Sequence, residues 1–306
     1  MKTGIIKIVL IYIMLCFIWG STWLAIRFGL ETLTPFCSAG LRFILASVFI
    51  LTLMKFRRVT LQTDKASMRL YFIMGFFSFV IPFGLVYWAE QFVPSGIAAV
   101  LFAVFPFFVL IFSYYFIKDS FIDFFKIGGI ILGFSGIVVI FADQFVGEFT
   151  DYIVGMIAIV VSATMQAGII TTIKKFGHHL NPLSMNFVPM LIAGFSMLGL
   201  SFVIEDVSQN TFELNGILSI LYLSFFGSLI TFTSYYWLLK KINIVILSFT
   251  AFITPITALI LGYFTYNEEL SSSDFIGTIL VLIGVFCANM GNLIKIRRNS
   301  ALQSGG

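Results

Sequence analysis

The sequence predicts an all-α polytopic membrane protein, on the basis of its composition, its ten apolar segments and the separation of its charges. Of the 306 residues, 59% are hydrophobic and only 10% are charged, whereas a soluble domain typically carries about 25% charged residues. A mean hydropathy of +1.05 means more apolar side chains than a soluble core can bury, so most of them are expected to face lipid or one another. The length excludes an additional soluble catalytic domain.

Ten apolar segments bounded by charges, Pro or Asn are each long enough to cross a bilayer as a helix. They are expected near residues 7–28, 34–54, 69–89, 95–117, 124–142, 152–173, 183–204, 216–239, 243–265 and 275–294. Pro94 and Gly96 favour a turn in the short connection between the third and fourth segments. The first apolar run lacks a small-x-small cleavage site, which favours a first span over a signal peptide.

The charges predict the orientation of these spans. If the N-terminus is cytoplasmic, 16 of the 18 Lys and Arg residues fall in cytoplasmic segments, while Arg27 falls outside and Arg42 lies within a span. Of the 14 acidic residues, 11 fall on the opposite side. Cytoplasmic loops are rich in Lys and Arg, so both termini are expected to be cytoplasmic.

The two halves of the chain match each other at a nearly constant offset, which indicates an internal repeat. At an offset of 149, the pairs include Phe83 with Phe232, Tyr87-Trp88 with Tyr236-Trp237, Pro106 with Pro255, and Asp119 with Glu268; at 148, Gly129 pairs with Gly277 and Gly136 with Gly284. Because each half holds five spans, the second copy would enter the membrane from the opposite side. Such inverted repeats favour alternating access with a substrate site near the midplane.

Two segments resemble a known family. Trp19-Gly20-Ser21-Thr22-Trp23 in the first span and Pro35 followed by Leu41-Arg42-Phe43 in the second resemble the EamA-type transporters of the drug/metabolite transporter superfamily, and the resemblance extends over essentially the whole chain. It implies a ten-helix, two-repeat fold in the bacterial inner membrane and, most often, export of amino acids, metabolites or toxic compounds. One departure is Lys118-Asp119-Ser120 after the fourth span, where the second copy has Asn267-Glu268-Glu269.

The predicted organisation is a first EamA-like repeat at residues 1–147, a second at 148–298 and a disordered tail at 299–306. Cys16, Cys37 and Cys287 lie far apart in apolar stretches, which favours small core residues over a disulfide or metal site.

Arg42 is the strongest candidate for substrate binding. It lies well inside the second span, where a charge is costly unless it faces a wet cavity or a partner. It is therefore expected to point inward, either as a counter-charge for a substrate carboxylate or as a structural arginine held by backbone carbonyls. The full set of candidate binding residues is Trp19, Ser21, Trp23, Arg42, Tyr87, Trp88, Gln166, Asn186, Tyr236, Trp237 and Asn289.

Each of the other candidates has a structural alternative. Trp88 and Trp237 lie near helix ends, where an interfacial aromatic belt is the alternative, and the intramembrane amides could join helices instead of lining the path. Pro106, Pro255 and Gly20 are candidate hinge or gating residues, with static kinks as the alternative. Glu90 is a possible proton or amine site, or else a solvated residue at a helix end.

The expected function is that of a secondary transporter that exports amino acids or related metabolites across the cytoplasmic membrane. The expected partners are a small-molecule substrate and lipid, with no cofactor, metal, nucleic acid or obligate protein partner. No Gly-x-x-x-x-Gly-Lys-Ser/Thr motif for nucleotide hydrolysis is present. A membrane-embedded enzyme or lipid-handling protein is the main alternative, but such a protein needs clustered His, Cys or acidic residues, and the chain has 2 His.

Overall fold

The structure is a computed structural model that describes the backbone of residues 2–117, 124–142, 151–248, 250–268 and 270–304. Side chains are described in these ranges between residues 5 and 288, apart from Ala142 and Phe252. All regular secondary structure in the described ranges is helical. Nine helical segments there are long and apolar enough to cross a membrane, and Ser272–Ala288 is a shorter apolar helix. The predicted all-helical membrane fold is confirmed, whereas the orientation of the termini stays a prediction.

Six of the predicted spans are single helices. They are α1 (Lys2–Leu30), α2 (Pro35–Phe56), α7 (Phe124–Ala142), α8 (Asp151–Phe176), α9 (Ser184–Ile204) and α14 (Ser272–Ser304). The last of these continues as a helix through residues 299–304, the segment predicted to be a disordered tail. A short 3₁₀ turn, η3 (Val207–Gln209), follows α9.

Three other spans are interrupted. The third consists of α3 (Lys65–Met74), the π-helical η1 (Gly75–Val80) and α4 (Ile81–Ala89), and the eighth of α10 (Leu214–Ser224), the π-helical η4 (Phe225–Ile230) and α11 (Thr231–Leu239). The fourth consists of α5 (Ser95–Phe102) and α6 (Phe105–Phe116). The ninth is described as α12 (Ile244–Ser248) and α13 (Thr250–Tyr266), on either side of residue 249. The π-helical segments of the third and eighth spans therefore occur at corresponding places in the two halves.

Local sequence explains several helix starts. Pro35 occupies the first turn of α2, a position that does not need a backbone N–H. The Asp64 side chain accepts a hydrogen bond from Ser67 N at 3.0 Å and caps α3. A hydrogen bond from the Ser67 hydroxyl, together with that from Ser67 N, holds the pKa of the Asp64 carboxyl below its usual value. Pro106 lies in the first turn of α6, after the break that follows α5.

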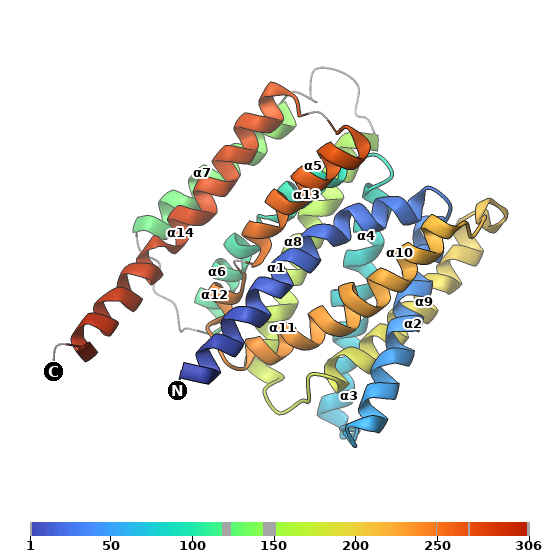
Figure 1. Ribbon diagram of the computed structural model, residues 1–306, viewed down its shortest axis with the longest axis horizontal. Helices are drawn as coiled ribbons and strands as arrows, with labels where there is room; N and C mark the ends of the chain where they lie inside the picture. The colour runs from blue at the N-terminus through green and yellow to red at the C-terminus, as the bar shows by residue number, and fades with distance from the viewer. Residues whose placement is uncertain (1, 118–123, 143–150, 249, 269, 305–306) are drawn as a thin grey trace.

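The helices form a bundle with two distinct edges (Figure 1). The pair α7 and α14 lies along one edge, and α2, α3 and α9 lie along the other, with α1, α4, α8 and α11 between them. Both ends of the chain lie at the lower end of the bundle in this view. We call this the basic end, because α2, α8 and α11 finish there near Lys55, Lys174 and Lys240; the opposite end, with Glu31, Glu205 and Glu268, is the acidic end.

Glycines allow α7 and α14 to pack with their backbones in close contact. A Cβ added to Gly136 would lie 2.6 Å from the Gly277 carbonyl oxygen, and one added to Gly284 would lie 2.6 Å from the Gly129 carbonyl oxygen. These are the glycines that match between the two halves of the sequence. Small residues at helix contacts are a common means of association in lipid, where no hydrophobic driving force brings helices together.

We predict opposite effects for two substitutions on α7. Gly136→Ala should lower the free energy of unfolding by about 1–3 kcal/mol, because its new methyl group meets backbone atoms of α14. Gly128→Ala is the matched control, since a Cβ there meets no atom within 4 Å; it should be neutral or stabilising by up to about 1 kcal/mol. Thermal unfolding of both purified variants measures the difference, and equal melting temperatures would contradict this packing.

Candidate functional site

A cavity of about 110 Å³, measured as the space open to the centres of water-sized spheres, lies between the helices in the middle of the bundle. Its walls are mostly aromatic and aliphatic, with Arg42 as the one charged residue among the lining residues that the structure describes. Aromatic lining residues are Trp19, Trp23, Phe83, Phe102, Phe105, Phe232, Tyr235 and Tyr236.

Arg42 is held in place by three hydrogen bonds to neutral groups. Its Nε donates to Ser228 Oγ at 3.0 Å, and its two terminal nitrogens donate to Tyr87 Oη at 3.2 Å and to the Gly227 carbonyl at 3.1 Å. The guanidinium carbon also lies 5.1 Å from the centre of the Phe83 ring. These contacts join α2 to α4 and η4. No carboxylate within the described ranges is in ion-pair contact with Arg42.

A cluster of phenylalanines lies at one wall of the cavity, where Phe83 and Phe232 line it and other rings pack behind them. The Phe43 and Phe83 rings are 5.1 Å apart at 85°, and the Phe79 and Phe232 rings are 5.1 Å apart at 57°. These are the edge-to-face and tilted arrangements that the ring quadrupoles favour. Trp19 extends the wall, with its ring centre 5.0 Å from that of Tyr235. The cluster presents a rigid apolar surface next to the Arg42 charge.

Gln166 compensates for a proline on the opposite helix. Pro82 lacks the N–H that would bond to the Ser78 carbonyl in an α-helix. The Gln166 Nε2 donates to that carbonyl at 2.8 Å, and Ser78 Oγ donates to Gln166 Oε1 at 3.0 Å. Ser162 Oγ donates to the Pro82 carbonyl at 2.9 Å. These polar groups of the cavity satisfy one another, whereas the buried Tyr235 hydroxyl has no hydrogen-bond partner among the described residues.

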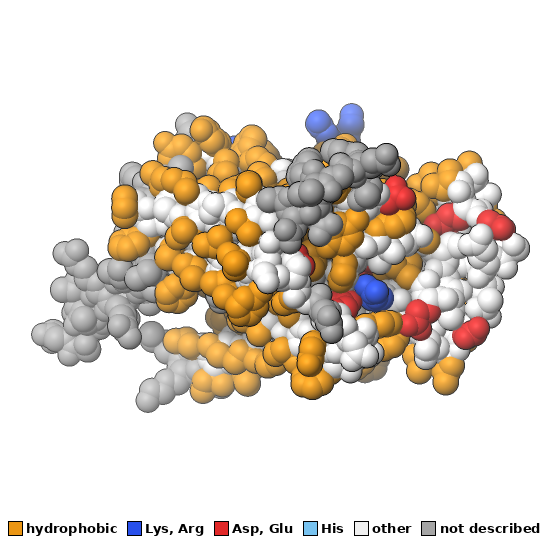
Figure 2. All heavy atoms as spheres, turned by 90° about the horizontal axis from the view of Figure 1, so that it is seen from above, with side chains coloured by type: hydrophobic (Ala, Val, Ile, Leu, Met, Phe, Trp, Pro, Cys, Tyr) orange, Lys and Arg blue, Asp and Glu red, His pale blue; other side chains and the backbone are white. Residues whose placement is uncertain are grey.

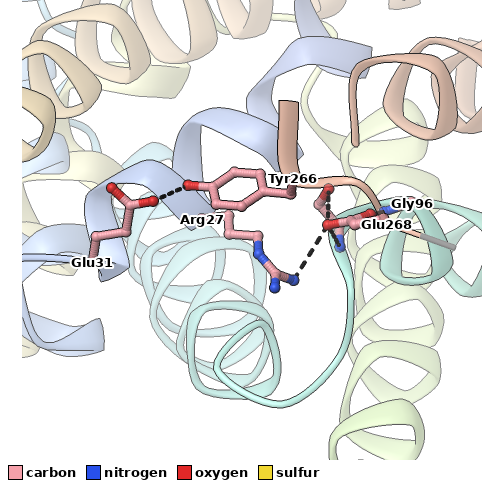
Figure 3. Close-up of polar contacts among 6 residues, drawn as sticks. Arg27, Glu31, Gly96, Tyr266 and Glu268 are labelled. Carbon is pink, nitrogen blue, oxygen red and sulfur yellow. Dashed lines mark hydrogen bonds and ion pairs between the residues drawn. The ribbon is translucent and has the colours of Figure 1, made fainter. Parts of the chain in front are cut away.

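An ion pair joins distant segments of the chain at the acidic end (Figure 3). Arg27 Nη1 of α1 lies 3.3 Å from Glu268 Oε1, in the segment after α13. Glu268 also accepts hydrogen bonds from Ser95 N and Gly96 N at 3.0 and 3.1 Å, which are the first amides of α5. A carboxylate is favourable at a helix N-terminus because of the partial positive charge there. Glu268 thus joins three segments of the chain.

Tyr266 adds a second connection at the same place. The Arg27 guanidinium lies 4.9 Å from the centre of the Tyr266 ring, and the Tyr266 hydroxyl donates to Glu31. Figure 2, viewed onto this end, shows several Asp and Glu side chains and one Lys or Arg side chain among them. Glu205 has a similar role on the other side of the bundle, where it accepts from Phe36 N at 2.7 Å at the start of α2.

Lysines make the corresponding contacts at the basic end. Lys174 Nζ donates to the Ile242 carbonyl at 3.1 Å, and Lys240 Nζ donates to the His178 carbonyl at 2.8 Å. Cations near the carbonyl ends of helices are favourable for the same reason that anions are favourable at N-termini. Tyr12 Oη donates to the Ile246 carbonyl at 3.1 Å and joins α1 to α12.

Comparison with known sequences places the chain in a family. The EamA-like transporter family matches residues 6–142 and again residues 153–290. The chain belongs to this family.

Several curated relatives of this EamA protein are named as transporters, and they are of similar length. It is 28% identical to Protein PagO of Salmonella typhimurium, with 92% of each chain covered. It is 29% identical to the inner membrane transporter YedA of Escherichia coli K12, with 90% of this chain and 89% of YedA covered. A solved crystal structure matches the fold with a TM-score of 0.71 at 16% identity, covering 93% of this chain and 98% of that one. The family and these relatives identify a multi-pass membrane transporter and not an enzyme.

Some of the binding residues predicted from the sequence lie together at the cavity of this EamA protein. The cavity is lined by Trp19, Trp23, Arg42, Gln166 and Tyr236. Tyr87 lies behind it, hydrogen-bonded to Arg42. The binding role of these residues stays a prediction.

Four other predicted binding residues lie away from the cavity lining. Ser21 Oγ is 2.6 Å from Tyr222 Oη, and Asn186 Nδ2 donates to the Pro182 carbonyl at 2.9 Å. Trp88 packs on Phe92 with ring centres 5.2 Å apart. Trp237 lies under Lys7 Nζ at 5.4 Å. The side chain of Asn289 lies outside the described residues.

The gating candidates and Glu90 have specific environments. Gly20 lies against Thr257, where an added Cβ would be 2.5 Å from the threonine Cβ, so its small size serves the contact between α1 and α13. Pro106 begins α6, whereas Pro255 is inside α13. The alternative of a solvated helix-end residue is wrong for Glu90, because only 3% of this residue is exposed.

The structure adds residues that the sequence analysis did not select. Phe83 and Phe232 both line the cavity, and the matching of these two positions between the halves was the signal that could have identified them. The sequence singles out Arg27 only as a basic residue on the non-cytoplasmic side and Glu268 only as the repeat match of Asp119. Their pairing joins segments far apart in the chain, so no local pattern indicates it.

We predict that Glu268→Gln loosens the acidic end. The substitution removes the charge that pairs with Arg27 and weakens the cap on α5, effects worth roughly 1 kcal/mol or a fivefold change in an equilibrium. With Cys16, Cys37 and Cys287 replaced by serine, a reporter at Ile26→Cys, which lines the cavity next to Arg27, should react about fivefold faster with a bulky maleimide. Glu213→Gln, at an exposed position, is the control. Unchanged labelling in Glu268→Gln would show that the ion pair does not restrict entry.

Proposed function

We propose that this EamA protein is a secondary transporter that exports amino acids or related small amphipathic metabolites across the cytoplasmic membrane by alternating access. The observation that carries the proposal is the central cavity, which places one uncompensated positive charge, Arg42, against an aromatic wall. A solute with a carboxylate and an apolar body complements both features. Amino acids and small organic acids have this chemistry.

The contacts at the two ends of the bundle support alternating access. In the proposed cycle, the contacts of Arg27 and Glu268 hold the acidic end closed. The basic end is joined by lysine-to-carbonyl contacts such as that of Lys174 with Ile242. Export requires these two sets of contacts to break in turn, so that the cavity opens first to one side and then to the other. The positive-inside rule makes the basic end cytoplasmic.

The interrupted fourth span supplies one place where such a change can occur. It is divided into α5 and α6, and Pro106 follows the division. Its repeat match Pro255 lies inside α13, where a proline removes an intrahelical hydrogen bond and favours a kink. We infer that α5 moves with its contact to the acidic end, the hydrogen bonds of Ser95 to Glu268.

Metabolite profiling of cells that overproduce the protein tests the proposal. The wild type should enrich the culture medium in one or a few carboxylate-bearing metabolites relative to cells with an empty vector. Arg42→Gln, which removes the charge but keeps a hydrogen-bonding side chain, should reduce this enrichment about tenfold or more, because hydrogen bonds to charged groups contribute about 1.5–3 kcal/mol.

The control is Arg69→Gln at the basic end, outside the cavity lining, with both variants compared at equal membrane abundance. Enrichment that is equal in Arg42→Gln and the wild type would remove Arg42 from substrate binding while retaining export. Absence of any enrichment by the wild type, followed by uptake of the same metabolites in liposomes, would reverse the proposed direction.

A further inference from the structure

Glu90 is a buried carboxyl group without a hydrogen-bond partner. It directly follows the span Lys65–Ala89, at the acidic end, and only 3% of the residue is exposed. Neither of its carboxylate oxygens has a hydrogen-bond partner within the part of the chain that the structure describes. An ionised carboxylate in such a site costs several kcal/mol, whereas the protonated form does not carry this cost.

The charged groups around Glu90 come from several helices. Arg27 of α1, Arg42 of α2 and Glu268 after α13 act on it electrostatically, and Tyr87 lies one turn earlier on its own helix. On α8, which packs against α4, Tyr152 faces Glu268 and Asp274. Arg27 is paired with Glu268, and Arg42 donates to Tyr87, Ser228 and Gly227. Neither arginine is therefore in ion-pair contact with Glu90.

The effect of burial exceeds that of the two arginines. Burial raises the pKa of Glu90 well above its usual value, Arg27 and Arg42 lower it, and Glu268 raises it. The hydrogen bonding also favours the protonated form of Glu90, because neither carboxylate oxygen has a hydrogen-bond partner among the described residues. Glu90 is also absent from the cavity lining, so an amine in the cavity does not reach it in this conformation, whereas a proton can occupy the site.

We propose that Glu90 is a proton-binding site, and that the acidic end of the transporter closes only when Glu90 is protonated. When Glu268 holds Arg27, Glu90 is left buried without a counter-ion. When the acidic end opens, water reaches Glu90 and Arg27 becomes free to pair with it, so that the carboxyl group releases one proton. The inference rests on the proposed alternating access, but it concerns the control of one end and not the substrate.

The sign of the pH dependence follows from this linkage. The closed form binds the proton more tightly, so lowering the pH favours closure and raising the pH through the pKa of the closed form favours opening. Measurements between pH 5.5 and 8.5, with Glu90→Gln as the comparison, test this direction.

Two measurements on the purified protein test the proposal without any substrate. The first is infrared spectroscopy in the region of the protonated carboxyl stretch. Wild-type protein at pH 7 should show a carboxylic acid band that Glu90→Gln lacks and that the exposed-site variant Glu213→Gln retains. Identical spectra for the wild type and Glu90→Gln would show that Glu90 is ionised and would overturn the proposal.

The second measurement is the rate of maleimide labelling of Ile26→Cys, in the cysteine-replaced background, as a function of pH and corrected for the pH dependence of thiol reactivity with a model peptide. In the Ile26→Cys protein that retains Glu90, the corrected labelling rate should rise at least threefold from pH 5.5 to 8.5. Glu90→Gln should stay at the slow, closed-state rate throughout, and Glu90→Asp should recover the pH dependence and show that the site tolerates substitution. A pH dependence that persists in Glu90→Gln would overturn the role of Glu90, whereas failure of export alone would leave both measurements unaffected.

Discussion

The structure depends on one buried positive charge, that of Arg42. A guanidinium in the middle of a membrane protein must be hydrogen-bonded, and its neutral partners on α4 and η4 fix where three helices meet. Because those partners are a phenol, a hydroxyl and a carbonyl, the charge itself is retained. Arg42 is therefore structural in its hydrogen bonds, while its charge has no ion-pair partner among the described residues. The two alternatives considered for it, a structural arginine and a counter-charge for a substrate carboxylate, are not exclusive.

The two ends of the bundle use helix dipoles in opposite ways. Glu205 and Glu268 come from segments distant in sequence and accept hydrogen bonds from the first amides of α2 and α5. Lys174 and Lys240 donate to carbonyls at the other end. The charge asymmetry that orients the chain in the membrane thus also supplies the groups that hold its helices together. Such contacts are individually modest, which suits connections that have to break in each transport cycle.

Much of the fold could be predicted because its determinants are local. Apolar runs of sufficient length, prolines at helix starts and the alternation of Lys and Arg with Asp and Glu are all properties of short stretches. The cavity could be predicted only in part. Trp19, Trp23 and Arg42 belong to motifs, whereas Phe83 and Phe232 are two of 38 phenylalanines, and apart from their match between the two halves they are distinguished by their place in three dimensions.

The environment of Glu90 could not be predicted from its neighbours in the sequence. Its position after an apolar run next to a proline-containing turn is typical of a solvated helix end. Its burial depends on which distant segments meet there, and the nearby charges come from α1, α2 and the segment after α13. A carboxyl group that breaks the local rule in this way is the kind of residue for which a functional reason is expected.

The π-helical turns impose a constraint on the length of the chain. Each residue of a helix turns the following side chains by about 100°, and a π turn accommodates one residue more than an α turn. Tyr87 and Glu90 follow η1, and Tyr235 and Tyr236 follow η4. Deleting a single residue upstream within either span would rotate these side chains away from their present neighbours while leaving the hydropathy almost unchanged. In evolution, the third and eighth spans should therefore accept many apolar replacements but few insertions or deletions.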